Sequence, residues 1–282
     1  MSKHLIRQTD DDAAGSRLSC LKKKYYEDKF LNLFIQRARP RLPLINIGTY
    51  CRIKAVNECI QDFISKNREA CAIVSLGAGS DTTPFHLLPT HVNLDYYEID
   101  FEESVAAKQK VIDSNEELTR IVSESNGRYH LYGMDLRKIN DERYNYHYDL
   151  NKPTLLISEC CLCYLKPQEA DEILQFFINK APKTSVVVYE PLYLDDSFGR
   201  VMSENFAMRG ISMPTVEAYP DLVSQVKRFE HYGFNKVIAK SLFTYYNELD
   251  KDDKERISRL EFLDELEEMI LLLSHYGIIY AY

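Results

Sequence analysis

The 282-residue sequence predicts an α/β protein whose mostly parallel sheet is covered by helices on both faces. Five short apolar runs alternate with amphipathic or charged segments, the pattern of strands and crossover helices in such a sheet. The first run ends at Gly77 and Gly79, a Gly-x-Gly turn typical of a strand that leads into a helix over a bound ligand. Hydrophobic residues make up 45% of the chain, so we expect one domain of residues 1–282 with a sizeable core.

Each strand is predicted from an apolar run bounded by polar or turn-forming residues. These runs are residues 71–76, 93–99, 129–134, 154–158 and 185–190, and Pro191 stops the last of them. Helices are predicted at 52–65, 102–123 and 168–179. Apolar residues between 260 and 273 predict a long amphipathic helix that packs on the core, and residues 276–282 predict a final strand in the same sheet.

Two segments fall outside the alternating pattern. Residues 1–50 are expected to form an N-terminal helical cap, in which Pro40 and Pro43 break the chain before the helix at 52–65. Residues 191–230 are irregular and contain Pro214 and Pro220. We interpret them as a lid inserted over the rim of the sheet.

Charge and cysteine content exclude several classes of function. Lys and Arg number 35 against 43 Asp and Glu, a net charge of −8 that argues against a nucleic-acid partner. No apolar stretch approaches a membrane span of ~20 residues, and the start lacks a signal-peptide core, so we expect no membrane partner and a place in the cytoplasm or the nucleus. The seven cysteines show no spacing typical of a disulfide framework, so we expect them to be reduced thiols. The pair Cys160 and Cys163 lacks a second pair or a nearby histidine, so we interpret it as packing, with no metal.

Chemistry is expected at the carboxyl ends of the strands, where open α/β sheets bind ligands. The residues at or just past predicted strand ends are Gly77, Asp100, Asp135 and Glu159, with Glu190 as a further candidate. They would line several hydrogen-bond acceptors along one rim.

The spacing of Gly79 and Asp100 favours a nucleoside ligand. Asp100 lies 21 positions past Gly79 at the end of the second strand, where an acid accepts hydrogen bonds from ribose hydroxyls. A dinucleotide fingerprint would have a third glycine where this chain has Thr82, which disfavours a nicotinamide or flavin cofactor. S-adenosylmethionine has the ribose without the pyrophosphate, so it suits both the turn and the acid.

Several short motifs run in order along the chain. They are Thr9-Asp10, residues 48–52, 76–82 and 97–100, Asp135-Leu136, residues 157–160, Tyr164, residues 196–199, and the ending Leu-Glu-Phe-Leu-Asp-Glu at 260–265. Taken together, they give the sequence a resemblance to the leucine carboxyl methyltransferase family.

The resemblance implies a class I S-adenosylmethionine-dependent methyltransferase fold with an added helical lid. It implies methyl esterification of the C-terminal leucine of the protein phosphatase 2A catalytic subunit, which would be the partner. Arg17 and Arg52 would hold the methionine carboxylate of the cofactor, and Gly77 and Gly79 would form its backbone turn. Family members often have lysine at the position of Arg17, which keeps the charge and changes the geometry.

The remaining roles also follow from the resemblance. Asp100 would bind the ribose, Asp135 and Leu136 would flank the adenine, and Glu159 would face the methionine amino group. Tyr164 would lie toward the acceptor tail, and together with Arg52 it is the candidate for a catalytic role.

The chemistry of this reaction agrees with the lack of a catalytic His or Cys pattern. A peptide's terminal carboxylate has a pKa of ~3.3–3.7, is ionised at neutral pH and needs no general base. Other readings stay open: a small-molecule O-methyltransferase with a different lid, or a phosphatase-binding protein without turnover. A transfer-RNA-modifying relative is disfavoured, since it carries a repeat-rich extension for which a chain ending at 282 has no room.

Overall fold

A seven-stranded sheet forms the centre of the molecule. The computed structural model describes residues 3–144, 146–181 and 183–282. The strand order is β3-β2-β1-β4-β5-β7-β6. The strands are β1 (Cys71–Leu76), β2 (Leu94–Asp100), β3 (Tyr129–Gly133), β4 (Thr154–Glu159), β5 (Thr184–Pro191), β6 (Val237–Ser241) and β7 (Tyr276–Ala281).

The first five strands are parallel, as predicted, and the order reverses between β1 and β4. Leu76 pairs with Ile99 on one side and with Ser158 on the other, so β1, β2 and β4 end at the same level. This is the switch point where doubly wound sheets bind ligands. The predicted final strand is confirmed as β7, which pairs antiparallel with both β5 and β6.

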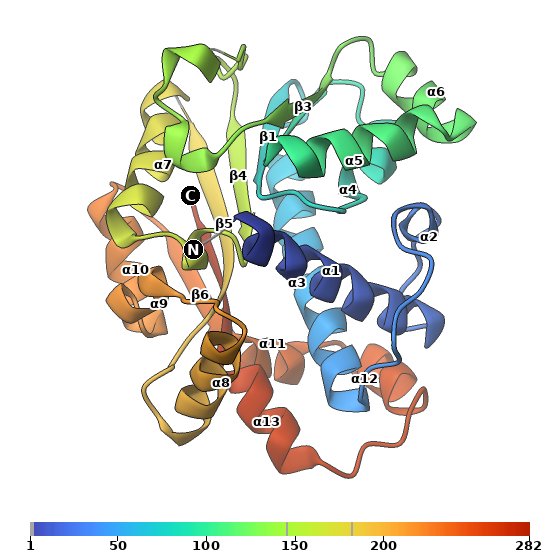
Figure 1. Ribbon diagram of the computed structural model, residues 1–282, viewed down its shortest axis with the longest axis vertical. Helices are drawn as coiled ribbons and strands as arrows, with labels where there is room; N and C mark the ends of the chain where they lie inside the picture. The colour runs from blue at the N-terminus through green and yellow to red at the C-terminus, as the bar shows by residue number, and fades with distance from the viewer. Residues whose placement is uncertain (1–2, 145, 182) are drawn as a thin grey trace.

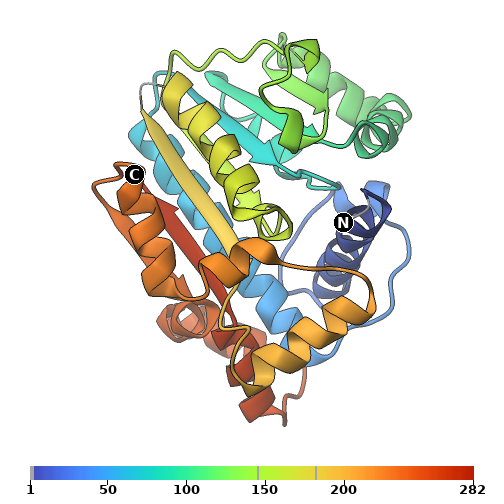
Figure 2. The same cartoon turned by 60° about the vertical axis from the view of Figure 1, so that its left-hand side comes forward.

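Alternate residues of the strands pack into two separate cores. Ile73 of β1 lies in one core with α3 (Pro43–Lys66), whereas Ala72 and Val74 lie in the other with α7 (Pro167–Lys180). Figures 1 and 2 show α3 and α7 on opposite sides of the sheet. The predicted two-sided α/β architecture is therefore confirmed.

The other helices connect the strands or cover the sheet. Before β1 lie α1 (Lys3–Lys22) and α2 (Leu31–Phe34). Between β1 and β5 lie α4 (Thr83–Leu87), α5 (Glu102–Asp113), α6 (Glu116–Glu124) and the short 3-10 turns η1 (Leu136–Lys138), η2 (Glu142–Tyr144) and η3 (Leu162–Tyr164). After β5 lie α8 (Ser197–Met208), α9 (Pro214–Ala218), α10 (Leu222–His231), α11 (Leu242–Glu248), α12 (Lys251–Ser258) and α13 (Leu266–Ser274).

The structure corrects the helix boundaries at two places. Pro43 does not break the chain but begins α3, because proline is well tolerated at the first helical position. The predicted helix at 102–123 is two helices, since Asn115 caps α6 by accepting hydrogen bonds from the backbone N–H groups of Glu117 and Leu118.

The predicted long helix over 260–273 is confirmed only from residue 266 onward. Helix α13 begins only at Leu266, and residues 261–265 are not helical. Asn46 of α3 donates to the Glu261 carboxylate at 2.7 Å, which holds this non-helical segment against α3. Of the apolar residues in the stretch, Met269 and Leu273 are buried, whereas Phe262 is 83% exposed.

Strand β6 was not predicted. Its residues are partly or fully exposed and it lies at the edge of the sheet, so it has neither a continuous apolar run nor a clear alternation. The expected cap at 1–50 contains α1, α2 and the start of α3, and the expected lid at 191–230 contains α8, α9 and most of α10. Helix α10 places Phe229 in the same core as α7.

A search of the described helices found none with the length and apolar character needed to cross a membrane.

Replacing Phe177 by alanine tests the core between α7 and the sheet. Phe177 is fully buried and packs against Phe176 and Tyr148. Deleting a buried phenyl ring leaves a cavity, so we expect Phe177→Ala to lower the free energy of unfolding by about 3–5 kcal/mol in urea titrations. Phe262→Ala removes the same ring from an exposed site and should change it by less than about 0.5 kcal/mol. Equal effects of the two substitutions would contradict this assignment of the core.

Candidate functional site

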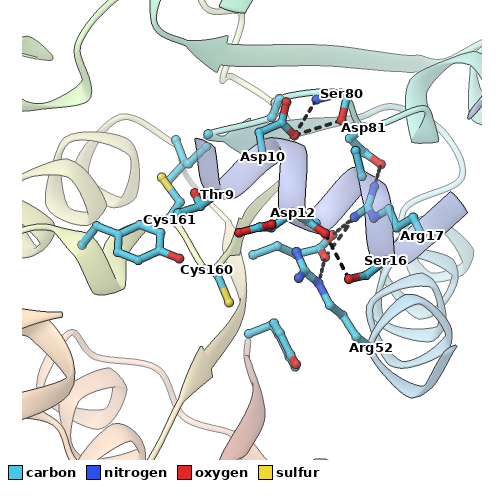
Figure 3. A pocket seen from close by; sticks show the side chains of 18 of the residues that line it. Thr9, Asp10, Asp12, Ser16, Arg17, Arg52, Ser80, Asp81, Cys160 and Cys161 are labelled. Carbon is cyan, nitrogen blue, oxygen red and sulfur yellow. Dashed lines mark hydrogen bonds and ion pairs between the residues drawn. The ribbon is translucent and has the colours of Figure 1, made fainter. Parts of the chain in front are cut away.

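A cavity of about 490 Å³ lies at the carboxyl ends of β1, β2, β4 and β5. This volume is within the range of about 300–1,000 Å³ that is usual for small-molecule sites. Helix α1 forms one wall, and residues from α3, α8 and α13 form others. Its charged lining side chains are Asp10, Asp12, Arg17, Arg41, Arg52, Asp81, Asp100, Asp135, Glu159 and Arg209. Figure 3 shows the cavity with several of them labelled.

The Gly-x-Gly turn after β1 needs both of its glycines. Gly77 and Gly79 have φ angles of +66° and +48°, a region that favours glycine. A Cβ on Gly77 would lie 2.6 Å from the Cys161 Sγ, and one on Gly79 would lie 2.3 Å from an Asp10 carboxylate oxygen. Gly77 lines the cavity, whereas the space beside Gly79 is filled by Asp10.

Asp10 fixes α1 to this turn. The backbone N–H and the hydroxyl of Ser80 donate to the Asp10 Oδ1 at 3.1 and 2.9 Å. Figure 3 shows Asp10 pointing from α1 toward Ser80. The N-terminal helix is thereby held over the carboxyl end of β1.

Asp100, at the end of β2, is held by two backbone groups. The N–H of Gly79 donates to its Oδ2 at 2.7 Å, and the N–H of Phe101 donates to its Oδ1 at 2.6 Å. Burial raises the pKa of Asp100, although these two hydrogen bonds act in the opposite direction. Each carboxylate oxygen can accept more than one hydrogen bond, so Asp100 can also accept from a ligand hydroxyl in the cavity.

Glu159, at the end of β4, is shared by two arginines. The Nε of Arg52 on α3 donates to Glu159 at 2.6 Å, and the Nη2 of Arg17 on α1 donates to it at 3.1 Å. The Nη1 of Arg17 also donates to Asp81 at 2.8 Å. All four side chains are at most 17% exposed, and removing one partner of such a buried group typically costs about 3–5 kcal/mol.

The charges of this cluster are stable at neutral pH. Burial is the largest single effect and lowers the pKa of Arg17 and of Arg52, but Glu159 and the other groups around them together outweigh it, so both pKa values are raised. Burial would likewise raise the pKa of Glu159, but Arg52 and Arg17 together lower it below the usual value. The cavity therefore holds one carboxylate between two permanent cations.

Asp135 and Leu136 lie where β3 ends. Asp135 is buried, caps η1 by accepting from the backbone N–H of Arg137, and forms an ion pair with the Arg137 guanidinium at 2.6 Å. Leu136 and Met134 add an apolar surface to the same part of the cavity.

The residues after Glu159 divide between packing and cavity. Cys163 is buried against Met213 and Val216, which fits its predicted packing role. Cys160 and Cys161 line the cavity instead. Tyr164 also lines it; burial raises the pKa of its hydroxyl, while a hydrogen bond with Thr9 acts in the opposite direction. The Tyr164 hydroxyl is neutral at physiological pH.

Sequence reasoning missed a second group of charges. Asp12 on α1 forms ion pairs with Arg209, which follows α8, and with Arg41, which precedes α3, at 3.6 Å for the latter. All three side chains line the cavity. No local pattern could indicate this group, because Asp12 lies 29 and 197 positions from its partners. Exposed ion pairs of this kind typically contribute only about 0–1 kcal/mol.

Glu190 is not part of the cavity. It lies on β5, fully buried, and accepts a hydrogen bond from Gln225 of α10 at 3.4 Å. Burial raises its pKa to about 7, against the opposing effect of Arg228. Apart from Glu190 and Gly79, the rim residues proposed from the sequence line one cavity.

Comparisons with known proteins agree on one family. The family described as leucine carboxyl methyltransferase matches residues 1–178. Leucine carboxyl methyltransferase 1 of Yarrowia lipolytica is 38% identical, over 98% of this chain and 96% of the relative. The protein of the same name from Schizosaccharomyces pombe is 34% identical, over 98% and 94%. The leucine carboxyl methyltransferase 1 homolog of Arabidopsis thaliana is 34% identical, over 98% and 88%.

Solved structures support the fold. A Thermobifida fusca protein described as a candidate methyltransferase has a TM-score of 0.54 at 11% identity, covering 89% of this chain and 91% of that one. A DUF574 family protein from Streptomyces avermitilis has a TM-score of 0.53 at 12% identity, covering 85% of each chain. The predicted class I methyltransferase fold is confirmed.

The buried Glu190 generates a pH prediction. A pKa raised from 4.5 to about 7 means that the folded state binds the proton more tightly, so this stabilisation is present at low pH and is lost as the pH rises through 7. Between pH 5 and pH 8, the wild-type protein should lose on the order of 2–3 kcal/mol of unfolding free energy relative to Glu190→Gln, measured in urea. The exposed Glu172→Gln serves as the control and should follow the wild-type pH dependence. Parallel pH curves for wild type and Glu190→Gln would contradict the prediction.

Proposed function

The chain belongs to the leucine carboxyl methyltransferase family, and from this premise we propose that it uses S-adenosylmethionine to methyl-esterify a C-terminal leucine, that of the protein phosphatase 2A catalytic subunit. The observation that carries the proposal is the cluster of Arg17, Arg52 and Glu159 beside the glycine turn. It provides charges of both signs next to a nucleoside-binding corner of the sheet.

The residues of the cavity fit this cofactor group by group. Glu159 suits the amino group of the methionine part, and Arg17 and Arg52 suit its carboxylate. Asp100 has acceptor capacity left for ribose hydroxyls, and Asp135 can accept from the adenine amino group above the apolar surface of Leu136. S-adenosylmethionine, when bound, supplies a methyl group on a positively charged sulfur, which a nucleophilic oxygen can displace.

The protein's part in the reaction is to bind and orient the two reactants. The acceptor carboxylate is ionised at neutral pH, so no side chain has to remove a proton from it. Holding the reactants in line can lower the barrier by as much as ~7–11 kcal/mol. The neutral hydroxyl of Tyr164 can donate a hydrogen bond to the acceptor, and its link to Thr9 on α1 orients it.

The apolar wall of the cavity supports leucine as the terminal residue of the acceptor. Beyond the charged cluster, the cavity is lined by side chains from α3, α8 and α13 and the turn after η3. These are Ile45, Leu165, Phe206, Leu272 and Leu273. A terminal leucine could bury its side chain there while its carboxylate stays in the polar part of the cavity, which Arg41 and Arg209 also line.

Arginine substitutions test the cofactor site. Arg52→Met keeps an unbranched side chain and removes the guanidinium with its charge-assisted hydrogen bonds, each worth about 1.5–3 kcal/mol. We expect the affinity for S-adenosylhomocysteine in calorimetry to fall by about 10- to 100-fold. Arg17→Lys keeps the charge, so its affinity for S-adenosylhomocysteine should fall less than that of Arg17→Met. Arg200→Met, an exposed position on α8, is the control. An Arg52→Met variant with undiminished affinity would contradict the proposal that Arg52 binds the cofactor.

A labelling experiment tests the acceptor. Incubation with methyl-labelled S-adenosylmethionine and the phosphatase catalytic subunit should give a base-labile methyl ester, because the product is an ester of a carboxylate. A phosphatase lacking its terminal leucine should incorporate no label above background. If the truncated phosphatase is labelled equally, the acceptor assignment is wrong.

A further inference from the structure

The cavity contains two pairs of arginines that differ in exposure and in neutralisation. The inner pair, Arg17 and Arg52, is 15% and 17% exposed and has two acids to share, Glu159 and Asp81. The outer pair, Arg41 and Arg209, is 34% and 45% exposed. Among the described residues, Asp12 is the one acid that forms an ion pair with either of them. The outer pair therefore carries an excess positive charge.

The outer pair and its counter-ion Asp12 come from three separate parts of the chain. Arg41 lies just before α3, Arg209 follows the last turn of α8, and Asp12 lies on α1 between them. Figure 3 shows Asp12 on the side of α1 that faces the cavity. The guanidinium of Arg41 also donates to the backbone carbonyl of Asp12 at 3.4 Å, and its buried Nε has no partner in the part of the chain that the structure describes.

We propose that Arg41 and Arg209 form an anion subsite that recognises the terminal carboxylate of the acceptor, with Asp12 as the internal counter-ion that this carboxylate replaces. The inference rests on the proposed function, because it assigns the acceptor a free carboxylate. Asp12 is 48% exposed, and an ion pair at such a position is weak enough to be exchanged for a carboxylate that accepts a charge-assisted hydrogen bond from a guanidinium.

The subsite also distinguishes the substrate from the product. A carboxylate carries a full charge and has two equivalent oxygens, so it can pair with a guanidinium through one while the other stays free to react. Its methyl ester is neutral and can accept only ordinary hydrogen bonds. After methylation, Asp12 can pair again with Arg41 and Arg209, which favours release of the ester.

The test uses N-acetyl-leucine and N-acetyl-leucinamide as probes, titrated by NMR into protein saturated with S-adenosylhomocysteine. The two probes differ in the charge of the terminal group. We expect the wild-type protein to bind the acid at least tenfold more tightly than the amide. Asp12→Asn frees both arginines and should strengthen binding of the acid severalfold, whereas Arg209→Gln should remove most of the preference for the acid over the amide.

Arg200→Gln is the matched control, since Arg200 lies on α8, the helix that Arg209 directly follows, but does not line the cavity. It should bind both probes as the wild type does. The affinity for S-adenosylhomocysteine is measured in each variant, and the change in binding of the acid has to exceed any change in cofactor affinity. Wild-type protein that shows no preference for the acid, including one that binds neither probe, would overturn the inference. So would an Arg209→Gln variant with the full preference, or an Asp12→Asn variant with weakened binding of the acid.

Failure of the inference and failure of the proposed function are distinguishable. Methylation of the phosphatase with no preference between the two probes would reject the anion subsite alone. A clear preference for the acid without methylation of the phosphatase would retain the subsite and reject the phosphatase as the acceptor.

Discussion

The carboxylate of Glu159 is the group on which the architecture of the cavity depends. It ends β4 and receives hydrogen bonds from Arg17 of α1 and Arg52 of α3, so it joins the sheet to two of the helices that wall the cavity. A buried carboxylate is costly without partners, and here the partners come from segments 142 and 107 positions away. The charges at the centre of the cavity and one of the attachments of α1 to the sheet are thus the same interaction.

Much of the fold could be predicted because the central strands are buried on both faces. Strands such as β1, in which every residue is buried, appear in the sequence as continuous apolar runs. Secondary structure was predicted wrongly where the hydrophobicity of a segment does not match its burial in the structure. Residues 260–265 contain apolar side chains but form no helix, and Glu261 among them is held by Asn46 of α3. The edge strand β6 is too exposed to give a pattern. In both segments, tertiary contacts determine the backbone conformation.

The site was predictable where it follows from strand ends or from motifs, and not where it depends on tertiary contacts. Asp100 and Glu159 end β2 and β4, so the topology of the sheet brings them to one cavity. The role of Gly79 could not be predicted from the sequence. In the structure, the Asp10 carboxylate of α1 fills the space that a side chain at position 79 would need. Glu190 also follows from a strand end, yet α10 covers it, which no spacing in the sequence reveals.

The separation of Asp12 from Arg209 has a consequence for how the molecule is made. The two residues are 197 positions apart, so the ribosome must add that many amino acids after Asp12 before the ion pair can exist. Helix α1 therefore leaves the ribosome long before all of its contacts can form. Such distant pairing carries a high entropic cost of loop closure and belongs to a topology of high contact order. A nascent chain interrupted before α8 contains Gly77, Gly79 and both inner arginines, but it lacks the wall of the cavity to which Phe206 and Arg209 belong.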